Sequence, residues 1–172
     1  MPSNRQDLFD RVFSDYSDKI YHLCCSYASN EEDRKDLHQD IMLRVWKSLP
    51  SFKNQSAIGT WVFRVAVNTS IDRLRKSNRR DHLVVSSHID DLAIPDRTES
   101  VENAVISNEK IRTLYRCING LSFLDKTLVS LYLEEMSYGE IADVVGMSRA
   151  NVGVRLYRIK KTLNRCLEGC QG

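Results

Sequence analysis

The stretch EIADVVGMSRANVGVRLYRIKKTL, residues Glu140–Leu163, decides the fold of the second half of this 172-residue chain. Apolar residues recur in it at spacings of three and four, which predicts helices. Gly146 favours the positive φ that ends one helix, and Ser148 can cap the next. Ser137, three residues before Glu140, completes a capping box. The stretch therefore predicts two helices joined by a tight turn, with Ile141, Ala142 and Val145 facing the core.

The second of these helices combines a narrow apolar seam with a cationic outer face. The seam is Val152, Leu156, Ile159 and Leu163. The outer face is expected to display Arg149, Asn151, Gly153, Val154, Arg155, Tyr157, Arg158 and Lys161. This is the layout of a helix-turn-helix, in which Arg and Asn read base edges in the major groove and cations neutralise phosphates. An ordinary helical hairpin with a solvated basic face is the alternative.

The rest of the chain is also expected to be helical. Gly and Pro are scarce, at 7 and 3, which disfavours a loop-rich β fold. Apolar spacing predicts helices after Asp7, from Asn30 to Pro50, from about Thr60 to Asn78, and between Glu109 and Leu133. We therefore expect an all-α fold of two small helical domains, residues 1–80 and 109–172, joined by a linker at 81–108 in which a further helix starts near Ser100.

Charge is distributed unevenly along the chain, although the net charge is only +2. The two expected domains carry +4 and +3, whereas the linker carries −5. Basic domains suit a polyanionic partner, which would repel an acidic connector. The first twenty residues hold seven charged side chains, and no stretch approaches the roughly 20 apolar residues of a membrane span. The sequence therefore predicts a cytoplasmic protein without a membrane span.

The five cysteines match no zinc-finger or zinc-ribbon spacing. In a reducing cytosol we expect them to be free thiols, some of them in the core. Cys166 and Cys170 stand one helical turn apart and could pair with an outside group or oxidise. Because no His lies near that pair, we expect no bound metal, and the chain shows no nucleotide loop or nucleophile–base set that would indicate a cofactor or an enzyme.

Motifs along the chain resemble those of bacterial RNA polymerase sigma factors of the extracytoplasmic-function type. The first half matches with Asp36-Leu37-His38-Gln39-Asp40, Leu43-Arg44-Val45-Trp46, Thr60-Trp61, Arg64-Val65-Ala66-Val67-Asn68 and Asp72-Arg73-Leu74-Arg75. The second half matches from Tyr138 to Arg158. The chain departs from the family's motifs at three positions. Asp40 stands where the family usually has Glu, His38 stands where it has an apolar residue, and Gly153 stands where it often has a cation. The resemblance implies region 2 in the first domain and region 4 in the second, and no catalysis by the chain itself.

The resemblance also assigns roles to residues. The helix in the first domain would bind core RNA polymerase through Asp36, Gln39, Asp40, Met42 and Trp46. The following loop and helix would bind the −10 promoter element through Ser48, Phe52, Lys53, Asn54, Asn68, Arg73, Arg75, Lys76, Arg79 and Arg80. From the residues alone, a solvated acidic face, a core Phe and a locally bonded Asn are the alternatives. The two tryptophans are expected to be core residues rather than base-stacking ones.

In the second domain, the cationic outer face would read the −35 element. Gly153 either permits close backbone approach to DNA or removes a base-reading side chain. Relatives usually have an anti-sigma factor that clamps both domains, and nothing in this sequence requires one. Two other functions stay open: a free-standing helix-turn-helix regulator, which binds duplex DNA as a symmetric dimer, and a helical adaptor that never binds DNA.

Overall fold

The structure is a computed structural model that describes residues 3–80 and 109–170. Over these ranges the only regular elements are helices. They are α1 (Ser3–Tyr27), α2 (Glu31–Ser48), the 3₁₀ turn η1 (Leu49–Ser51), α3 (Ile58–Arg80), α4 (Glu109–Asn119), α5 (Phe123–Leu133), α6 (Tyr138–Val145) and α7 (Arg149–Gly169). The expected all-α fold is confirmed. The expected linker, including the helix start near Ser100, lies outside the described residues.

Side-chain caps explain where several helices begin and end. The Asn30 side chain accepts the Asp33 backbone N–H at 2.8 Å and starts α2. Ser137 and Glu140 form the expected capping box at α6, and Gly146, at φ 73°, ends that helix. Ser148 then caps α7. The predicted start of the first helix after Asp7 is wrong, since α1 begins at Ser3.

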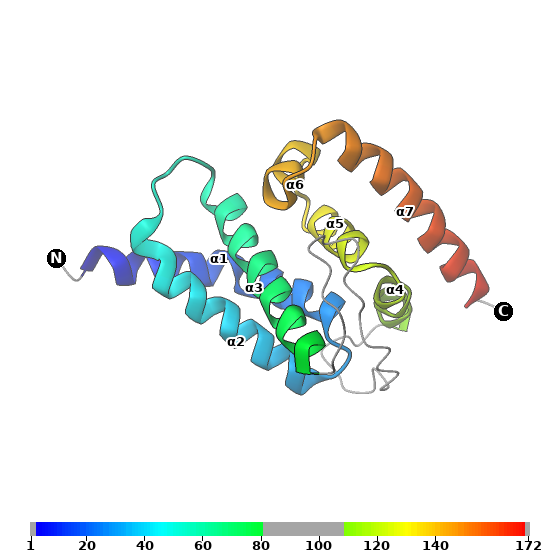
Figure 1. Cartoon of the computed structure of the whole chain (residues 1–172), viewed down its shortest axis with the longest axis horizontal. Coiled ribbons are helices and arrows are strands. Elements are labelled where there is room, and N and C mark those ends of the chain that lie inside the picture. The colour runs from blue at the N-terminus through cyan, green and yellow to red at the C-terminus, as the bar shows by residue number, and fades with distance from the viewer. Residues whose placement is uncertain (1–2, 81–108, 171–172) are drawn as a thin grey trace.

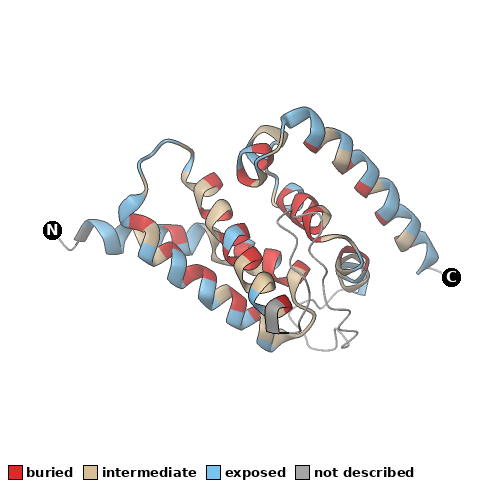
Figure 2. Cartoon of the chain, viewed as in Figure 1, coloured by how far each residue is buried: buried red, intermediate tan, exposed pale blue. Residues whose placement is uncertain are grey.

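The first three helices form one bundle, in which α1 packs against α2 and α3 (Figure 1). Its core contains Ile20, Leu23, Ile41, Val45 and Val62, all at or below 1% exposure. Figure 2 shows buried residues concentrated on the sides of α1–α3 that face one another.

The start of α3 lies close to a side chain of α1. A Cβ added to Gly59 would lie only 2.7 Å from the Tyr16 hydroxyl of α1. A larger residue at this position would displace the Tyr16 side chain, so Gly59 lets α3 begin close against α1, just after the loop that follows η1.

The helices α4–α7 form a second bundle, and α7 packs on α4, α5 and α6. Its seam residues Val152, Leu156, Ile159 and Leu163 are all buried, as expected. In α6 the inward residue is Val144 and not Val145, which is half-buried. The short α6 is covered on two sides, because both α3 and α7 pack against it. A single helical stripe therefore does not describe its buried face.

The two bundles are in direct contact, since α1 packs on α4 and α5 while α3 packs on α6. The ring of Tyr27 stacks on Phe123 at 4.7 Å, and its hydroxyl shares a hydrogen bond with Thr127. Ser26 and Ser130, both buried, share another. At the other end of this interface, the Arg64 guanidinium donates to the Asp143 carbonyl oxygen at 3.0 Å. Apolar packing and polar contacts therefore both join the two bundles.

The expectation of free cysteines is wrong for two of the five. Cys117 of α4 and Cys166 of α7 are joined by a disulfide, with an S–S distance of 2.07 Å. They stand 49 residues apart, so sequence spacing gave no indication that they meet. The thiols of Cys24, Cys25 and Cys170 are free.

Candidate nucleic-acid and polymerase interfaces

The exposed face of α2 carries the carboxylates expected to bind polymerase. Asp36, Gln39 and Asp40 are all exposed and lie on one helix face, as their spacing predicts. Met42 is buried at 6% exposure, so it faces the core and not this surface. The exposed apolar neighbour is Leu43, at 51%, which shares the face of Asp36, Gln39 and Asp40.

Leu43 is a residue that the sequence reasoning missed as a site residue. Its position three residues after Asp40 and four after Gln39 was the available signal. The sequence predicts Met42 as the apolar member of this surface, but the packing of α1 and α3 on α2 buries Met42 and leaves Leu43 exposed. We use the name α2 face for Asp36, Gln39, Asp40 and Leu43.

Trp46 lies at the edge of α2 and is covered by α1. Its ring meets Phe9 edge-on at 5.1 Å, and the Arg5 guanidinium lies 4.1 Å from its centre. Arg5 also donates to the Trp46 carbonyl oxygen at 2.6 Å. The half-buried ring therefore anchors the start of α1, in keeping with the expected core role of the tryptophans.

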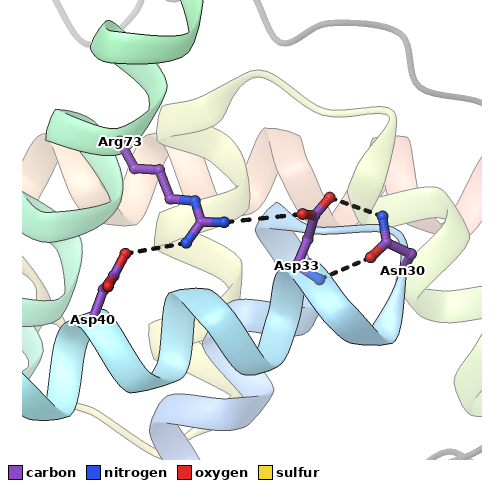
Figure 3. Close-up of polar contacts among 4 residues, drawn as sticks. All are labelled: Asn30, Asp33, Asp40 and Arg73. Atoms are coloured by element: carbon purple, nitrogen blue, oxygen red, sulfur yellow. Dashed lines mark hydrogen bonds and ion pairs between the residues drawn. The ribbon is translucent and has the colours of Figure 1, made fainter.

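A polar network connects the α2 face to α3 (Figure 3). Arg73 of α3 reaches Asp40 at 3.2 Å and Asp33 at 3.9 Å. Asp33 also accepts a hydrogen bond from the Asn30 amide at 2.8 Å, so the cap of α2 and the ion pair are linked. A second ion pair joins Arg44 to Asp72 at 2.6 Å. Arg73 thus binds carboxylates of its own chain.

The loop after α2 presents several of the residues expected at the −10 element. Lys53 and Asn54 are exposed, and Asn54 has a left-handed φ of 54°. Phe52 is half-buried, and its ring lies 5.1 Å from that of Trp61. Ser48 is half-buried, and its carbonyl oxygen accepts the Ser51 hydroxyl. Phe52 therefore belongs partly to the packing of the loop and keeps only part of its ring open.

The expected −10 residues on α3 differ in exposure. Asn68 is exposed, and within the described part of the chain its side chain makes no hydrogen bond. Lys76 is exposed and Arg75 half-buried. Arg79 and Arg80 end the helix, and the expectation for their side chains lies outside what the structure describes. Asn68 is therefore the open polar group on the middle of this helix.

The outer face of α7 is open and mixes cations with apolar groups. Arg149, Asn151, Arg158 and Lys161 are exposed. Val154 and Tyr157 are exposed at 54% and 61%, and the Lys161 ammonium lies 4.7 Å from the Tyr157 ring. We use the name α7 face for six exposed residues of this surface: Arg149, Asn151, Val154, Tyr157, Arg158 and Lys161.

The preceding helix, α6, begins with its capping box. The Ser137 backbone N–H donates to the Glu140 carboxylate, and this hydrogen bond lowers the pKa of Glu140. The Glu140 carboxylate is thereby favoured in its charged form.

Two residues expected on the outer face of α7, Arg155 and Gly153, are instead partly buried against other helices. Arg155 pairs with Asp125 of α5 at 2.6 Å, and both side chains are partly buried. Gly153 is half-buried against α6, where an added Cβ would lie 3.5 Å from the Tyr138 ring. That distance is an ordinary van der Waals contact, so the space beside Gly153 belongs to the α6–α7 packing.

No helix in the described ranges is both long and apolar enough to cross a bilayer.

Comparison with known protein families gives two matches, in chain order. Residues 12–80 match the family model of sigma-70 region 2, and residues 111–163 match that of sigma-70 region 4. The matched ranges lie within the expected domains 1–80 and 109–172, and together they span most of the chain.

Curated relatives match along nearly the whole length. The chain is 29% identical to the ECF RNA polymerase sigma factor SigW of Bacillus subtilis, covering 94% of this chain and 90% of that protein. It is 28% identical to the ECF RNA polymerase sigma-E factor of Haemophilus influenzae, covering 93% and 87%.

Two solved structures share the fold. Sigma factor RpoE of Bartonella quintana, in complex with the anti-sigma factor NepR, has a TM-score of 0.71 at 20% identity and covers 93% of this chain and 96% of that one. CnrH, in complex with the cytosolic domain of CnrY, has a TM-score of 0.68 at 20% identity, with coverage of 97% and 92%.

Proposed function

The chain belongs to the sigma-70 family as a sigma factor of the extracytoplasmic-function type, and from this premise we propose which of its surfaces bind each partner. It directs transcription initiation, with core RNA polymerase and promoter DNA as its partners. Sigma factors are DNA-binding initiation factors, so the bond-forming chemistry belongs to the polymerase. The chain contributes binding and positioning.

The α2 face is the proposed docking surface for core polymerase. Its carboxylates are exposed, and the exposed Leu43 side chain offers an apolar contact in their midst. Protein interfaces commonly combine such an apolar centre with a polar rim. The ion pair between Asp40 and Arg73 is exposed, and exposed pairs contribute only about 0–1 kcal/mol. A cation on the polymerase can therefore replace Arg73 at little cost.

Two surfaces are proposed to bind the promoter. The loop with Lys53 and Asn54, together with Asn68 on α3, would bind the −10 element, where polar groups can contact unpaired bases. The α7 face would enter the major groove at the −35 element, with Arg158 and Asn151 as base readers. The exposed Val154 side chain suits a thymine methyl group.

The observation that carries this proposal is the pair of open faces on one chain. The first bundle exposes an acidic and apolar helix face, and the second exposes a cationic one. A free-standing DNA-binding regulator would not require the acidic and apolar α2 face. A helical adaptor that never binds DNA would not require the cationic α7 face. We further propose that the chain acts in the cytoplasm, where the polymerase is. We also propose that an anti-sigma protein can bind it, as NepR binds sigma factor RpoE of Bartonella quintana.

Run-off transcription tests the function. Core polymerase is mixed with a library of promoter fragments, with and without the protein. We expect defined transcripts only when the protein is present. If the polymerase gains no specificity, the proposed function is wrong, and duplex binding without polymerase would then identify a free-standing regulator.

A matched pair of variants assigns the polymerase surface. Asp36→Ala with Gln39→Ala should weaken polymerase binding in a pull-down while the helical circular dichroism stays unchanged. Asp15→Ala is the control, because Asp15 is an exposed carboxylate that lies on α1 and not on α2. Equal binding by both variants would refute the assignment.

A further inference from the structure

Three cysteine sulfurs converge where α4 and α7 end. Cys117 lies in the last turn of α4, and Cys166 and Cys170 lie at the end of α7. The three sulfur atoms lie within 4.8 Å of one another. A disulfide needs only two of them, so the third sulfur has no role in the Cys117–Cys166 bond. We propose that, in the reduced protein, these three thiolates bind one thiophilic metal ion of the Zn²⁺ class.

The spacing of the sulfurs fits such an ion. A tetrahedral zinc ion with Zn–S bonds of about 2.3 Å holds its sulfurs about 3.8 Å apart. The sulfur atoms of Cys117, Cys166 and Cys170 already lie within 4.8 Å of one another, which is close to that separation. Small side-chain movements are therefore enough. Three protein ligands leave a fourth position, which water or a small thiol can occupy.

The electrostatics at this point favour a cation. Cys117, Cys166 and Cys170 all lie at the C-terminal ends of their helices, where the backbone carries partial negative charge. These helix ends therefore favour a cation at the cluster.

Exposure increases along the cluster and provides a route of entry. Cys117 is buried, Cys166 half-buried and Cys170 exposed. An ion can thus bind first at Cys170 and then reach the inner thiols. The sulfurs come from helices that pack against each other, so the ligands are held by the fold and not by a loop.

Binding requires that the disulfide be reduced first. A cellular dithiol supplies two electrons and two protons, the S–S bond breaks, and the dithiol becomes a disulfide. The three thiols then release three protons to solvent as three sulfur–metal bonds form. A reducing cytoplasm, where the proposed function places the chain, maintains the thiols. Only this cellular setting rests on the proposed function, since the geometry is independent of it.

The bound ion would fasten the end of α7 to α4. A ligand that binds only the folded state stabilises it according to its concentration and affinity. The α7 face, residues 149–161, precedes the cysteines on the same helix and contains none of them. We therefore expect metal binding to raise the thermal stability of the second bundle without changing the DNA contacts themselves.

Metal titration of the full chain tests the proposal. The protein is reduced with a phosphine under argon, titrated with Zn²⁺ alone against a chromophoric chelator, and weighed by native mass spectrometry. We expect one ion per chain and a rise in melting temperature. With Co²⁺, a sulfur-to-metal charge-transfer band should appear.

Variants separate this site from other thiols. Cys170→Ser should fold normally, because Cys170 is exposed, and should lower the Zn²⁺ affinity at least tenfold. Cys117→Ser should abolish stoichiometric binding. Cys25→Ala is the control, since the Cys25 thiol is free and is not one of the three converging sulfurs, and this variant should bind as the wild type does.

Three results would overturn the proposal: no stoichiometric binding by the reduced protein, full affinity in Cys170→Ser, or a Cys117–Cys166 disulfide that persists in reductant. None of them depends on polymerase, so failure here leaves the transcription function untouched.

Discussion

The basic end of α3 and the outer face of α7 look alike in sequence but differ in what their cations contact. On α3, Arg73 binds Asp40 and Asp33 of α2. On α7, Arg149, Arg158 and Lys161 are exposed and open, whereas Arg155 pairs with Asp125. A count of cations therefore does not reveal which are available to DNA. The three-dimensional neighbours decide this, and they assign Arg73 and Arg155 at least partly to the fold.

The largest effect is expected from Arg158 on the open face. Arg158→Ala should reduce −35 selection, because a good base contact is worth about 1–3 kcal/mol of discrimination. Transcription from promoters with matched and mutated −35 elements measures the loss. Asn164→Ala, exposed farther along α7, is the control. Unaltered selection in Arg158→Ala would show that the α7 face does not read the −35 element.

Gly153 should respond as a packing residue. Gly153→Ala is expected to stabilise the chain by up to about 1 kcal/mol, because Ala is the better helix former and its Cβ would touch Tyr138 without crowding. Chemical unfolding measures the gain. Duplex affinity should be unchanged. A large loss of duplex affinity would instead place Gly153 against the DNA backbone.

The Arg155–Asp125 pair should contribute mainly to stability. A double-mutant cycle with Arg155→Ala and Asp125→Ala is expected to give a coupling energy of about 0.5–1 kcal/mol, since the pair is partly buried. Asp125→Ala alone should release Arg155 and steepen the salt dependence of duplex binding. Zero coupling, with duplex binding lost in Arg155→Ala alone, would make Arg155 a DNA contact.

The smallest expected effect is on the pH dependence of stability, and it comes from His22 at the interface between the bundles. The hydrogen bond to Glu134, at 2.8 Å, raises the pKa of His22 above its ordinary value of 6.5. Asp18 adds to this rise, and partial burial opposes it. The charged pair therefore stabilises the fold fully below the unfolded pKa, and this contribution is lost as the pH rises through the folded pKa.

Unfolding at several pH values, from roughly pH 6 to pH 8, measures this contribution. The wild type should lose stability relative to His22→Gln across the range. Because His22 is half-exposed, we expect only a small difference. Parallel pH profiles would show that the His22–Glu134 pair does not contribute.

Local features of the fold could be predicted from sequence, and long-range ones could not. Asn30, Ser137, Gly146 and Ser148 act through bonds within their own turns, so their patterns were sufficient to place helix ends. Met42 and Leu43 were misjudged because α1 and α3 cover two sides of α2, which widens its buried stripe.

In the candidate site too, local features could be predicted from sequence, whereas contacts between helices could not. Asp36, Gln39 and Asp40 of the α2 face and most of the α7 face could be predicted from helical spacing, whereas Leu43 was not. The roles of Arg73, Arg155 and Gly153 depend on residues of other helices, and the meeting of Cys117 with Cys166 depends on the packing of α4 on α7. None of these contacts leaves a signal within a single sequence.

The central claim is that separate faces of one chain bind the polymerase and the −35 element. Equilibrium titration of core RNA polymerase with labelled protein tests it most directly. We predict that Asp36→Ala/Gln39→Ala/Leu43→Ala loses affinity for polymerase at least tenfold, as expected when interface centres are truncated, while Arg158→Ala binds as the wild type does. Equal affinity of the triple variant and the wild type would contradict the account.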